Sequence, residues 1–281
     1  MTALPADGEE KFRRLLGLLA AEGTGLLAFS GGVDSSFLLK AMVMSGMKML
    51  AVTAESETLP AGDLRSALDI ATALGVDHRV IRSEELMSEA FASNRPDRCF
   101  HCKDGLFSNL RDIAEKESLG TVFDGSNADD LSDYRPGLAA ARLHGVRSPL
   151  AECGFTKAEI REMSRRLGLQ TWDRPSSPCL SSRFPYGRRI TAEGLKRVAE
   201  AEGFLGSLGI RELRVRDHGD TARIEVREED AGRVLEPGNR KKIVSKLRSL
   251  GYAFVALDLE GFRSGSLNRV LAGRETKPVP H

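Results

Sequence analysis

The chain has 281 residues, of which 41% are hydrophobic and 29% charged, and its 41 Lys and Arg against 40 Asp and Glu give a net charge of +1. This composition excludes wholesale disorder, because there are enough apolar side chains to bury a core. No apolar run approaches the roughly 18–20 residues that a membrane span needs, and the acidic, polar N-terminus does not resemble a secretory leader. We therefore expect a soluble cytoplasmic protein, and its near-neutral charge argues against nucleic acid as a partner.

Two domains are predicted, because the length exceeds the about 100–200 residues usual for one domain. Over residues 9–170, short β-prone runs alternate with segments of helical period, which indicates an α/β domain with a parallel sheet. The expected elements are, in chain order, a helix at 10–22, a strand at 26–29, a helix at 37–44, a strand at 49–54, a helix at 63–74, strands at 78–81 and 121–124, and a helix at 156–167. Thr156 and Glu159 form a capping-box signature for the last helix, while Gly75 and Gly168 suit left-handed C-caps.

The sequence changes character after residue 172. Residues 172–189 are rich in Pro, Ser and Arg and lack periodicity, which is typical of a linker or a functional loop. The elements expected beyond this loop are a helix at 191–205, a hairpin of strands 213–215 and 222–226 turning at 218–220, a helix at 241–250 and a strand at 254–259. We place the boundary at residue 187, so that an N-terminal domain covers residues 1–187 and a smaller α+β domain covers residues 188–281.

The most informative segment is A-F-S-G-G-V-D-S-S-F-L-L, residues 28–39, in which a buried strand turns into a helix. Gly31 and Gly32 let the backbone approach an oxyanion closely, and the helix N-terminus adds unpaired N–H groups and the positive end of its dipole. The segment matches neither G-x-x-x-x-G-K-[ST] nor G-x-G-x-x-G. It predicts a pyrophosphate site, with a plain glycine turn before a helix as the alternative.

S-G-G-V-D-S-S resembles the PP-loop of the ATP pyrophosphatases. The resemblance implies a parallel-sheet, adenine nucleotide alpha hydrolase-like (HUP-type) domain that binds ATP and Mg²⁺, cleaves ATP between the α and β phosphates, and forms AMP and pyrophosphate. It implies that six residues of the loop bind the pyrophosphate and its magnesium: Ser30, Gly31, Gly32, Asp34, Ser35 and Ser36. It also implies that Asp34 is catalytic. Ala54, at the end of the second strand, lies where that superfamily recognises adenine.

A second group of polar residues follows the strand at 121–124. Gly125 and Asn127 come at the carboxyl edge of the expected sheet, where ligands bind in open α/β folds, so we assign them to the nucleotide site. Asp129, Asp130 and Asp133 offer either magnesium ligands or ordinary helix caps.

Four cysteines, Cys99, Cys102, Cys153 and Cys179, are too few and too unevenly spaced for a disulfide framework. Cys99 and Cys102 form a C-x-x-C pair that can converge on one ion, and basic neighbours on both sides favour thiolates. Three uses stay open: a zinc site completed by His101 or Cys153, a metal-free redox pair, or, together with Cys179, a 4Fe-4S cluster whose fourth iron is open to sulfide. We favour the cluster and interpret Cys153 as a packed structural thiol.

Longer motifs narrow the family further. Five segments together resemble the LarE family of sulfur transferases: D-G-S-N-A-D-D-L-S-D-Y-R-P-G-L (124–138), R-S-P-L-A-E (147–152), T-K-A-E-I-R (156–161), the loop at 172–187, and G-F-R-S-G-S-L-N (261–268). The resemblance implies ATP-dependent conversion of a small nucleotide substrate, pyridinium-3,5-biscarboxylate mononucleotide, to its thiocarboxylate. That reaction belongs to the biosynthesis of the nickel-pincer nucleotide cofactor of lactate racemase. The resemblance also implies a symmetric homo-oligomer, which we expect to be a hexamer.

Two sources of sulfur follow from this resemblance. In the sacrificial branch of the family, a single cysteine at the position of Cys179 gives up its own sulfur and becomes dehydroalanine. This chain departs from that branch because it also carries Cys99 and Cys102. It is similar to the three-cysteine branch, in which a 4Fe-4S cluster delivers sulfide catalytically. We therefore expect cluster-based transfer from sulfide or another donor, with Cys179 counted as catalytic and the sacrificial route as the alternative.

Basic residues near Cys179 are candidates for binding substrate. Arg183, Arg188 and Arg189 could each hold a phosphate or a substrate carboxylate. By resemblance, Glu202 and Arg214 help bind the substrate phosphate, although a surface strand beside a charged helix would show the same pattern. We assign Arg183, Glu202 and Arg214 to the substrate site.

Three rival functions remain at this stage. A tRNA thiolase shares the PP-loop and the cysteine logic but needs a surface that binds a polyanion. A non-catalytic, cluster-bearing redox sensor would have no use for the PP-loop, and an ammonia-using synthetase would leave the cysteines unexplained.

Overall fold

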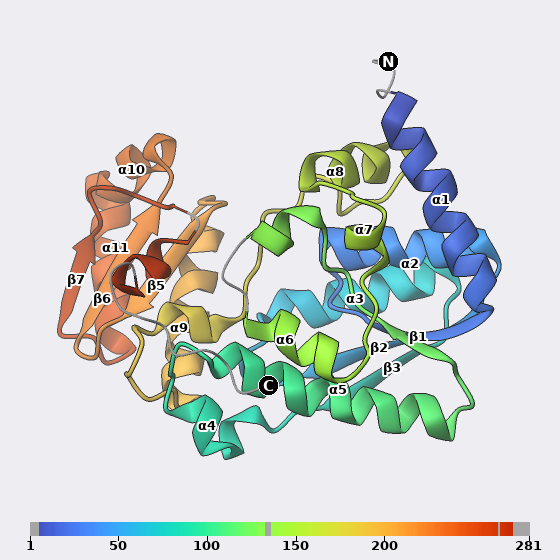
Figure 1. The fold of residues 1–281 in the computed structure, drawn as a ribbon. Coiled ribbons are helices and arrows are strands. Elements are labelled where there is room, and N and C mark those ends of the chain that lie inside the picture. Colours follow the sequence, from blue (N-terminus) through green and yellow to red (C-terminus); the bar gives the residue numbers. More distant parts are fainter. Residues whose placement is uncertain (1–5, 133–135, 264, 272–281) are drawn as a thin grey trace. The chain divides into compact units, whose positions relative to one another are not determined.

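The computed structural model describes residues 6–132, 136–263 and 265–271 (Figure 1). The chain divides into two compact units. The first contains Met1–Ser56, Ala61–Glu85 and Cys99–Ser176, and the second contains Glu57–Pro60, Leu86–Arg98 and Ser177–His281. The second unit thus takes two short segments from the first hundred residues. The domain boundary expected at residue 187 stays a prediction.

The first unit is built on a parallel sheet with the strand order β3-β2-β1-β4. Its strands are β1 (Thr24–Ala28), β2 (Lys48–Glu55), β3 (His78–Arg82) and β4 (Thr121–Phe123). The expected α/β class is therefore confirmed. The parallel arrangement follows from the helices that separate the strands, because each strand is followed by a crossover that returns the chain to the same edge of the sheet.

Helices cover both faces of this sheet (Figure 1). They are α1 (Ala6–Glu22), α2 (Val33–Ser45), α3 (Ala61–Leu74), α5 (Arg98–Lys116), α6 (Pro136–Leu143), α7 (Pro149–Glu152) and α8 (Lys157–Arg166). Leu27 of β1 packs with α1, α2 and α3 in one core, whereas its neighbour Leu26 packs with α5 and α6 in another. Successive strand residues point to opposite faces, so both faces of β1 are buried.

The predicted helix ends are confirmed where capping chemistry fixed them. Thr156 accepts a hydrogen bond from the backbone of Glu159, whose side chain in turn accepts one from the Thr156 backbone, so the capping box at α8 is complete. Gly75 and Gly168 have φ values of 65° and 72°, as left-handed C-caps require. Helix α5 was not predicted, because its first turn is charged and cysteine-bearing; its buried side is formed further along by Phe107, Leu110 and Ala114.

The second unit contains a three-stranded sheet with the order β5-β6-β7. β5 (Leu213–Asp217) and β6 (Thr221–Val226) form the predicted antiparallel hairpin, and β7 (Phe254–Leu257) pairs with β6 in parallel. The helices of this unit are α4 (Glu89–Ala92), α9 (Ala192–Ser207), α10 (Glu228–Leu235) and α11 (Pro237–Ser249). Three of them, α9, α10 and α11, pack on the sheet through a core of their own. In the part of the chain that the structure describes, no helix is both long and apolar enough to cross a membrane.

Candidate functional site

The PP-loop joins the end of β1 to the start of α2, and its backbone conformation requires glycine. Gly31 has a φ of 68°, and a Cβ atom there would lie 2.8 Å from the backbone nitrogen of Ala67. Gly32 is the N-cap of α2 and offers no capping side chain. The first amides of a helix have no partner within the helix, so this loop leaves them for a bound anion.

Side chains of the loop are arranged around the same helix end. Ser30 Oγ lies 3.0 Å from Ser35 Oγ and accepts a hydrogen bond from the Gly32 amide at 3.3 Å. Asp34 Oδ1 and Ser36 Oγ are two of the buried side-chain atoms in the described residues that have no hydrogen-bond partner, and they lie two positions apart at this helix end. Buried polar atoms are nearly always satisfied, so these two atoms mark a place for a ligand. A hydroxyl donor, a carboxylate and helix amides fit magnesium pyrophosphate.

Lys157 is a residue of this site that the sequence analysis missed. Its Nζ lies 2.5 Å from Asp34 Oδ2, and its backbone amide donates to Asp129 Oδ2 at 2.8 Å. The capping box at Thr156 sets the start of α8 and therefore the direction of the next side chain. Lys157 belongs to the segment T-K-A-E-I-R, which the sequence analysis used only for the family resemblance. Nothing in that segment indicated that Lys157 contacts a carboxylate 123 positions earlier.

The residues after β4 pack against the PP-loop and cap one another. A Cβ atom on Gly125 would lie 3.0 Å from the Ser35 amide nitrogen, so glycine lets the two segments touch. Asn127 Oδ1 accepts hydrogen bonds from the amides of Asp129 and Asp130, and Asp130 Oδ2 accepts one from the Asn127 amide. Of the two uses left open for the acidic residues, this geometry favours capping for Asp129 and Asp130. Asp133 lies outside the described residues.

Ala54 lies at the carboxyl end of β2, which pairs directly with β1. Its neighbour Thr53 is buried and donates from Oγ1 to the Phe29 carbonyl at 2.7 Å, which ties β2 to the entry of the PP-loop. Thr53 Oγ1 also lies 2.8 Å from His78 Nε2, and burial lowers the pKa of His78. The end of β2 is thus tied to the entry of the PP-loop, and the assignment of Ala54 to the adenine site stays a prediction.

The cysteines occupy three different environments. Cys99 and Cys102 lie three positions apart in the first turn of α5, so their side chains share one side of the helix, and both are partly buried. Cys179 is exposed at the N-cap of a short 3-10 turn (Leu180–Arg183), with its Sγ 2.8 Å from Ser181 Oγ. Cys153 is buried in the core of the first unit, and burial raises the pKa of its thiol. The interpretation of Cys153 as a structural thiol is confirmed.

Asn94 holds the loop that follows Cys179 to the segment that leads into Cys99. This fully buried residue has a φ of 54°, and its Nδ2 donates to the carbonyls of Phe184 and Pro185 at 3.2 and 2.8 Å. Its Oδ1 accepts from Arg98 Nη1 at 2.6 Å, and the Arg98 guanidinium stacks over the Tyr186 ring. All these contacts lie within the second unit. Cys99 is the next residue after Arg98.

A buried ion pair supports the Cys179 loop. Arg183 is 2% exposed and donates from Nε and Nη2 to the two carboxylate oxygens of Glu202, both at 2.9 Å. Its Nη1 donates to the carbonyls of Pro178 and Cys179. Glu202 Oε1 also accepts from the Val215 amide, so one carboxylate connects the Cys179 loop to β5. The predicted trio of Arg183, Glu202 and Arg214 is thus brought together on α9, β5 and the loop.

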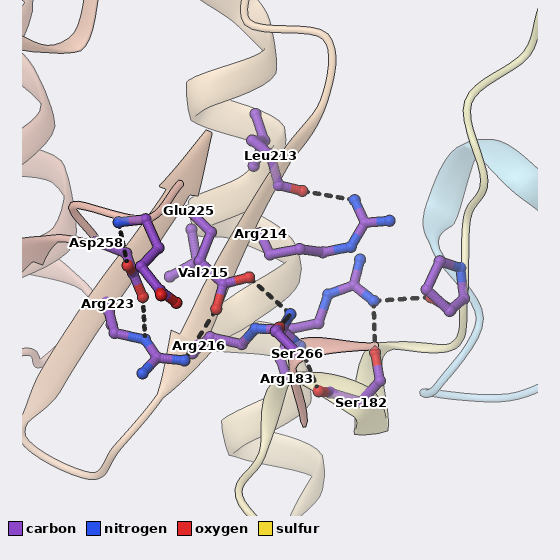
Figure 2. Close-up of polar contacts among 12 residues, drawn as sticks. Ser182, Arg183, Leu213, Arg214, Val215, Arg216, Arg223, Glu225, Asp258 and Ser266 are labelled. Atoms are coloured by element: carbon purple, nitrogen blue, oxygen red, sulfur yellow. Dashed lines mark hydrogen bonds and ion pairs between the residues drawn. The ribbon is translucent and has the colours of Figure 1, made fainter. Parts of the chain in front are cut away.

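The ion pair belongs to an arginine cluster that extends onto the hairpin (Figure 2). The arginine cluster consists of Arg183, Glu202, Arg214, Arg216 and Glu225. Every residue of β5 is buried, so the alternative of a surface strand does not hold. Arg216 donates to Glu225 and to the Ser182 carbonyl, and Arg214 donates to the Leu213 carbonyl (Figure 2). Burial, and then the positive charge of Arg183, lowers the pKa of Arg214 to about 10. An anion bound at Arg214 would relieve both effects.

Two other predicted arginines have protein partners. Arg188 donates to the fully buried Asp217, and Arg189 pairs with Glu89 at the surface. Within the described ranges, no three His, Cys, Asp or Glu side chains are grouped so that they could hold a metal ion.

Comparison with known proteins places this chain in a family. No family model matches it. It is 41% identical over 264 residues to an uncharacterized protein of Synechocystis sp., a match that covers 94% of this chain and 98% of the relative. It is 39% identical over 247 residues to the pyridinium-3,5-bisthiocarboxylic acid mononucleotide synthase of Lactiplantibacillus plantarum, covering 87% of this chain and 89% of that enzyme.

A more distant similarity extends beyond that family. The tRNA-specific 2-thiouridylase MnmA of Rickettsia rickettsii is 26% identical over 202 residues, which is 58% of this chain and 55% of the relative. This similarity agrees with the parallel sheet and the S-G-G-V-D-S-S loop in assigning the PP-loop, adenine nucleotide alpha hydrolase-like fold. From the loop, the fold and the near full-length match to the L. plantarum synthase, we conclude that this chain is an enzyme of the LarE family of sulfur transferases, within the PP-loop superfamily.

Proposed function

We propose that this enzyme uses ATP to convert the carboxylates of pyridinium-3,5-biscarboxylate mononucleotide to thiocarboxylates, in the biosynthesis of the nickel-pincer nucleotide cofactor. The observation that carries the proposal is the PP-loop, where Asp34 Oδ1 and Ser36 Oγ lie buried without partners among the described residues. The 39% identity to a synthase named for the bisthiocarboxylic acid product supplies the substrate class.

The reaction has two steps. A substrate carboxylate oxygen attacks the α-phosphorus of ATP, the bond from that phosphorus to the bridging oxygen breaks, and pyrophosphate leaves. The product is an acyl adenylate. A sulfur nucleophile then attacks the acyl carbon, the bond to the AMP oxygen breaks, and the thiocarboxylate and AMP are formed. Adenylation replaces a poor leaving group, oxide, by a good one, AMP.

At the nucleotide end, each residue has a defined task in this proposal. The amides at the start of α2, with Ser30, Gly31, Gly32, Ser35 and Ser36, hold the leaving pyrophosphate. Asp34 holds its magnesium, and Lys157, which pairs with Asp34 in the structure described here, neutralises charge that develops on the phosphates. Ala54 borders the adenine, while Gly125 and Asn127 support the loop from β4.

At the substrate end, Arg214 holds the mononucleotide phosphate. It is 8% exposed and its pKa is lowered, so it gains more from an anionic ligand than an exposed arginine would. Arg183 and Glu202 complete this end through their mutual pair and their bonds to the Cys179 loop and β5. The buried guanidinium of Arg183 therefore orients this end of the site.

For the sulfur step, Cys99, Cys102 and Cys179 hold a 4Fe-4S cluster in this proposal. Three thiols are the right donors for three irons, and the bonds of Asn94 and Arg98 support the idea because they join the segment before Cys99 to the loop after Cys179. When bound, the cluster would supply an open iron site for exogenous sulfide. Sacrificial transfer from Cys179 is the alternative, since that thiol alone is exposed.

We also propose that the enzyme works in the cytoplasm as a symmetric hexamer. Closed symmetric assemblies are the usual state of soluble oligomers, and the C-terminal unit offers exposed apolar residues at Phe254 and Leu259, which are 62% and 99% exposed. Light scattering should give six times the chain mass, and a fully active monomer would contradict this.

The function is tested by incubating anaerobically purified enzyme with ATP, Mg²⁺, sulfide and the biscarboxylate mononucleotide. We expect AMP, pyrophosphate and thiocarboxylate in matching amounts, measured by chromatography and mass spectrometry. The distant similarity to MnmA makes a tRNA thiolase the second candidate. Turnover with tRNA but not with the mononucleotide would therefore replace the proposed substrate, while no ATP cleavage with either would refute the assignment.

A further inference from the structure

Within the first unit, the side chain of Arg174 links its own segment to the PP-loop and to helix α3. Its Nη1 donates to the Gly31 carbonyl at 3.0 Å and to Ser66 Oγ at 2.6 Å, and its Nη2 donates to Asp63 Oδ1 at 2.6 Å. The side chain is 24% exposed and that of Asp63 is 12% exposed, so this is a largely buried, charge-assisted set of bonds.

The bond to Gly31 acts on the working surface of the PP-loop. A peptide group is planar, so the Gly31 carbonyl and the Gly32 N–H move together. Gly31 is in the left-handed region and cannot accept a Cβ atom against Ala67. Arg174 therefore fixes the orientation of the peptide that begins the anion-binding turn.

The backbone of Arg174 is held as firmly as its side chain. Arg161 on α8 donates from Nη2 to the Arg174 carbonyl at 2.7 Å and from Nη1 to the Trp172 carbonyl at 2.8 Å. Arg161 lies one turn after Lys157, which contacts Asp34 of the PP-loop. Helix α8 thus meets the loop through Lys157 and the Arg174 segment through Arg161.

The segment that bears Cys179 begins immediately after Arg174. Cys179 is five residues further along, and five residues span at most about 18 Å even when fully extended. Pro175 and Pro178 fix two of the intervening φ angles, which stiffens the connection. The connection between Arg174 and the cysteine segment is therefore short and is partly stiffened by the two prolines.

We propose that Arg174 is a positioning residue that couples occupancy of the PP-loop to the order of the segment bearing Cys179. A phosphate bound at the Gly32 N–H stabilises the peptide orientation in which Arg174 already holds the Gly31 carbonyl, so the Arg174 contacts open less often and the segment 176–183 becomes more ordered. Sulfur transfer is in this way tied to the presence of the activated substrate. The inference rests on the proposed function, because it takes the PP-loop to be the nucleotide site.

Hydrogen–deuterium exchange on the full-length enzyme tests this coupling. The probe is an ATP analogue with a methylene group between the α and β phosphates, added with Mg²⁺ at saturating concentration. In the wild type we expect slower exchange both in peptides from 29–40 and in peptides from 176–183. In Arg174→Ala, residues 29–40 should still be protected, whereas the protection of 176–183 should fall by at least about threefold, the change in opening equilibrium that loss of one such bond gives.

Two further variants separate coupling from general loosening. Arg174→Lys keeps a charge opposite Asp63 but presents one nitrogen, so it should bind the analogue and lose most of the coupling. Arg165→Ala removes a surface arginine of α8 that pairs with Glu162 and should behave as the wild type. Retained protection of 176–183 in Arg174→Ala, or its absence in the wild type when 29–40 is protected, would overturn the inference. Unprotected 29–40 in the wild type would instead refute the PP-loop as nucleotide site, and the coupling with it.

Discussion

The PP-loop of the first unit and the arginine cluster of the second unit are both polar, but they satisfy their polar groups in opposite ways. The PP-loop takes its groups from residues 30–36, which are neighbours in sequence, and leaves Asp34 Oδ1 and Ser36 Oγ without partners among the described residues. The arginine cluster takes its groups from a loop, a helix and two strands, and joins them by ion pairs and carbonyl bonds. The first region presents its unpartnered groups at one helix end, whereas the second compensates most of its charges internally and leaves Arg216 Nε without a hydrogen bond among the described residues.

This difference has consequences for what a mutation does. Removing a polar group from the PP-loop takes away ligand contacts and leaves the fold intact. Removing a member of the arginine cluster leaves a buried charge without its partner, so stability falls along with function. The following predictions test this contrast.

The largest effect is expected for Asp34→Ala. The carboxylate pairs with Lys157 and presents its second oxygen at the helix mouth, where magnesium and pyrophosphate must meet. Pyrophosphate release should fall by roughly 100-fold or more, as for loss of a transition-state charge contact, with the melting temperature little changed. Asp69→Ala, which removes an exposed carboxylate of α3, is the control. Unchanged AMP and pyrophosphate formation in Asp34→Ala would contradict the nucleotide assignment.

Three of the four cysteines should be needed to retain iron, and the fourth should not. Replacing Cys99, Cys102 or Cys179 with Ala should remove most of the iron from anaerobically reconstituted enzyme, because one cluster iron then loses its thiolate ligand and only two thiolates hold the cluster. Cys153→Ala should keep its iron, since Cys153 is buried in an apolar core. Iron and sulfide analysis with the visible spectrum measures this.

The sacrificial route predicts a different pattern. Only Cys179→Ala would then be inactive, and product would stop near one equivalent per donor. Mass spectrometry would find that residue lighter by about 34 Da, because a thiol loses hydrogen sulfide when it becomes dehydroalanine. Dehydroalanine at Cys179 after turnover of the reconstituted enzyme would overturn the cluster proposal.

Breaking the Arg183–Glu202 pair should destabilise the protein. The side chains are 2% and 15% exposed, and removing one partner of a buried pair costs about 3–5 kcal/mol. Glu202→Gln and Arg183→Met should each lower the melting temperature clearly, and the double variant should lose less than the sum of both. Glu162→Gln breaks a surface pair with Arg165 and should change stability by less than about 1 kcal/mol. Additive effects of the two cluster variants would show that the pair is not coupled.

The same contrast explains what sequence could and could not predict. The PP-loop was predictable because Ser30 to Ser36 are contiguous and their chemistry follows from a strand, two glycines and a helix end. The capping box at Thr156 was predictable for the same reason. Lys157 was not, because its partner lies 123 positions away and only the fold brings them together. Arg174 was hidden in a loop without periodicity, where nothing indicated its contact with Gly31.

For the arginine cluster, the residue types could be read from the sequence, but their burial could not. Arg214 and Arg216 alternate along β5, a pattern that equally fits an exposed face. The strand is buried throughout: Glu225 of the neighbouring strand β6 pairs with Arg216, and Glu202 of α9 accepts a hydrogen bond from the Val215 amide between the two arginines. Burial of a charge depends on such distant partners, so its prediction needs the tertiary structure.

The smallest effect concerns the pH dependence of anion binding at Arg214. Burial and the nearby charge of Arg183 lower the pKa of Arg214 from its usual value to about 10, so the folded protein releases this proton at lower pH than the unfolded chain. Below pH 10 the guanidinium is charged at a cost to folding. Between about pH 10 and the usual pKa of arginine the unfolded chain holds more protons, so this group makes stability rise with pH. A bound phosphate favours the charged form, and its affinity should therefore be flat from pH 8 to 9 and fall up to about tenfold per pH unit above 10. Titration with inorganic phosphate at constant ionic strength, within the range where circular dichroism stays native, measures this.

Two variants test whether Arg214 is the group that titrates. Arg214→Met should remove the decline in affinity, and Arg227→Met at the surface should keep it. A decline that persists in Arg214→Met would assign the anion to another group of the cluster.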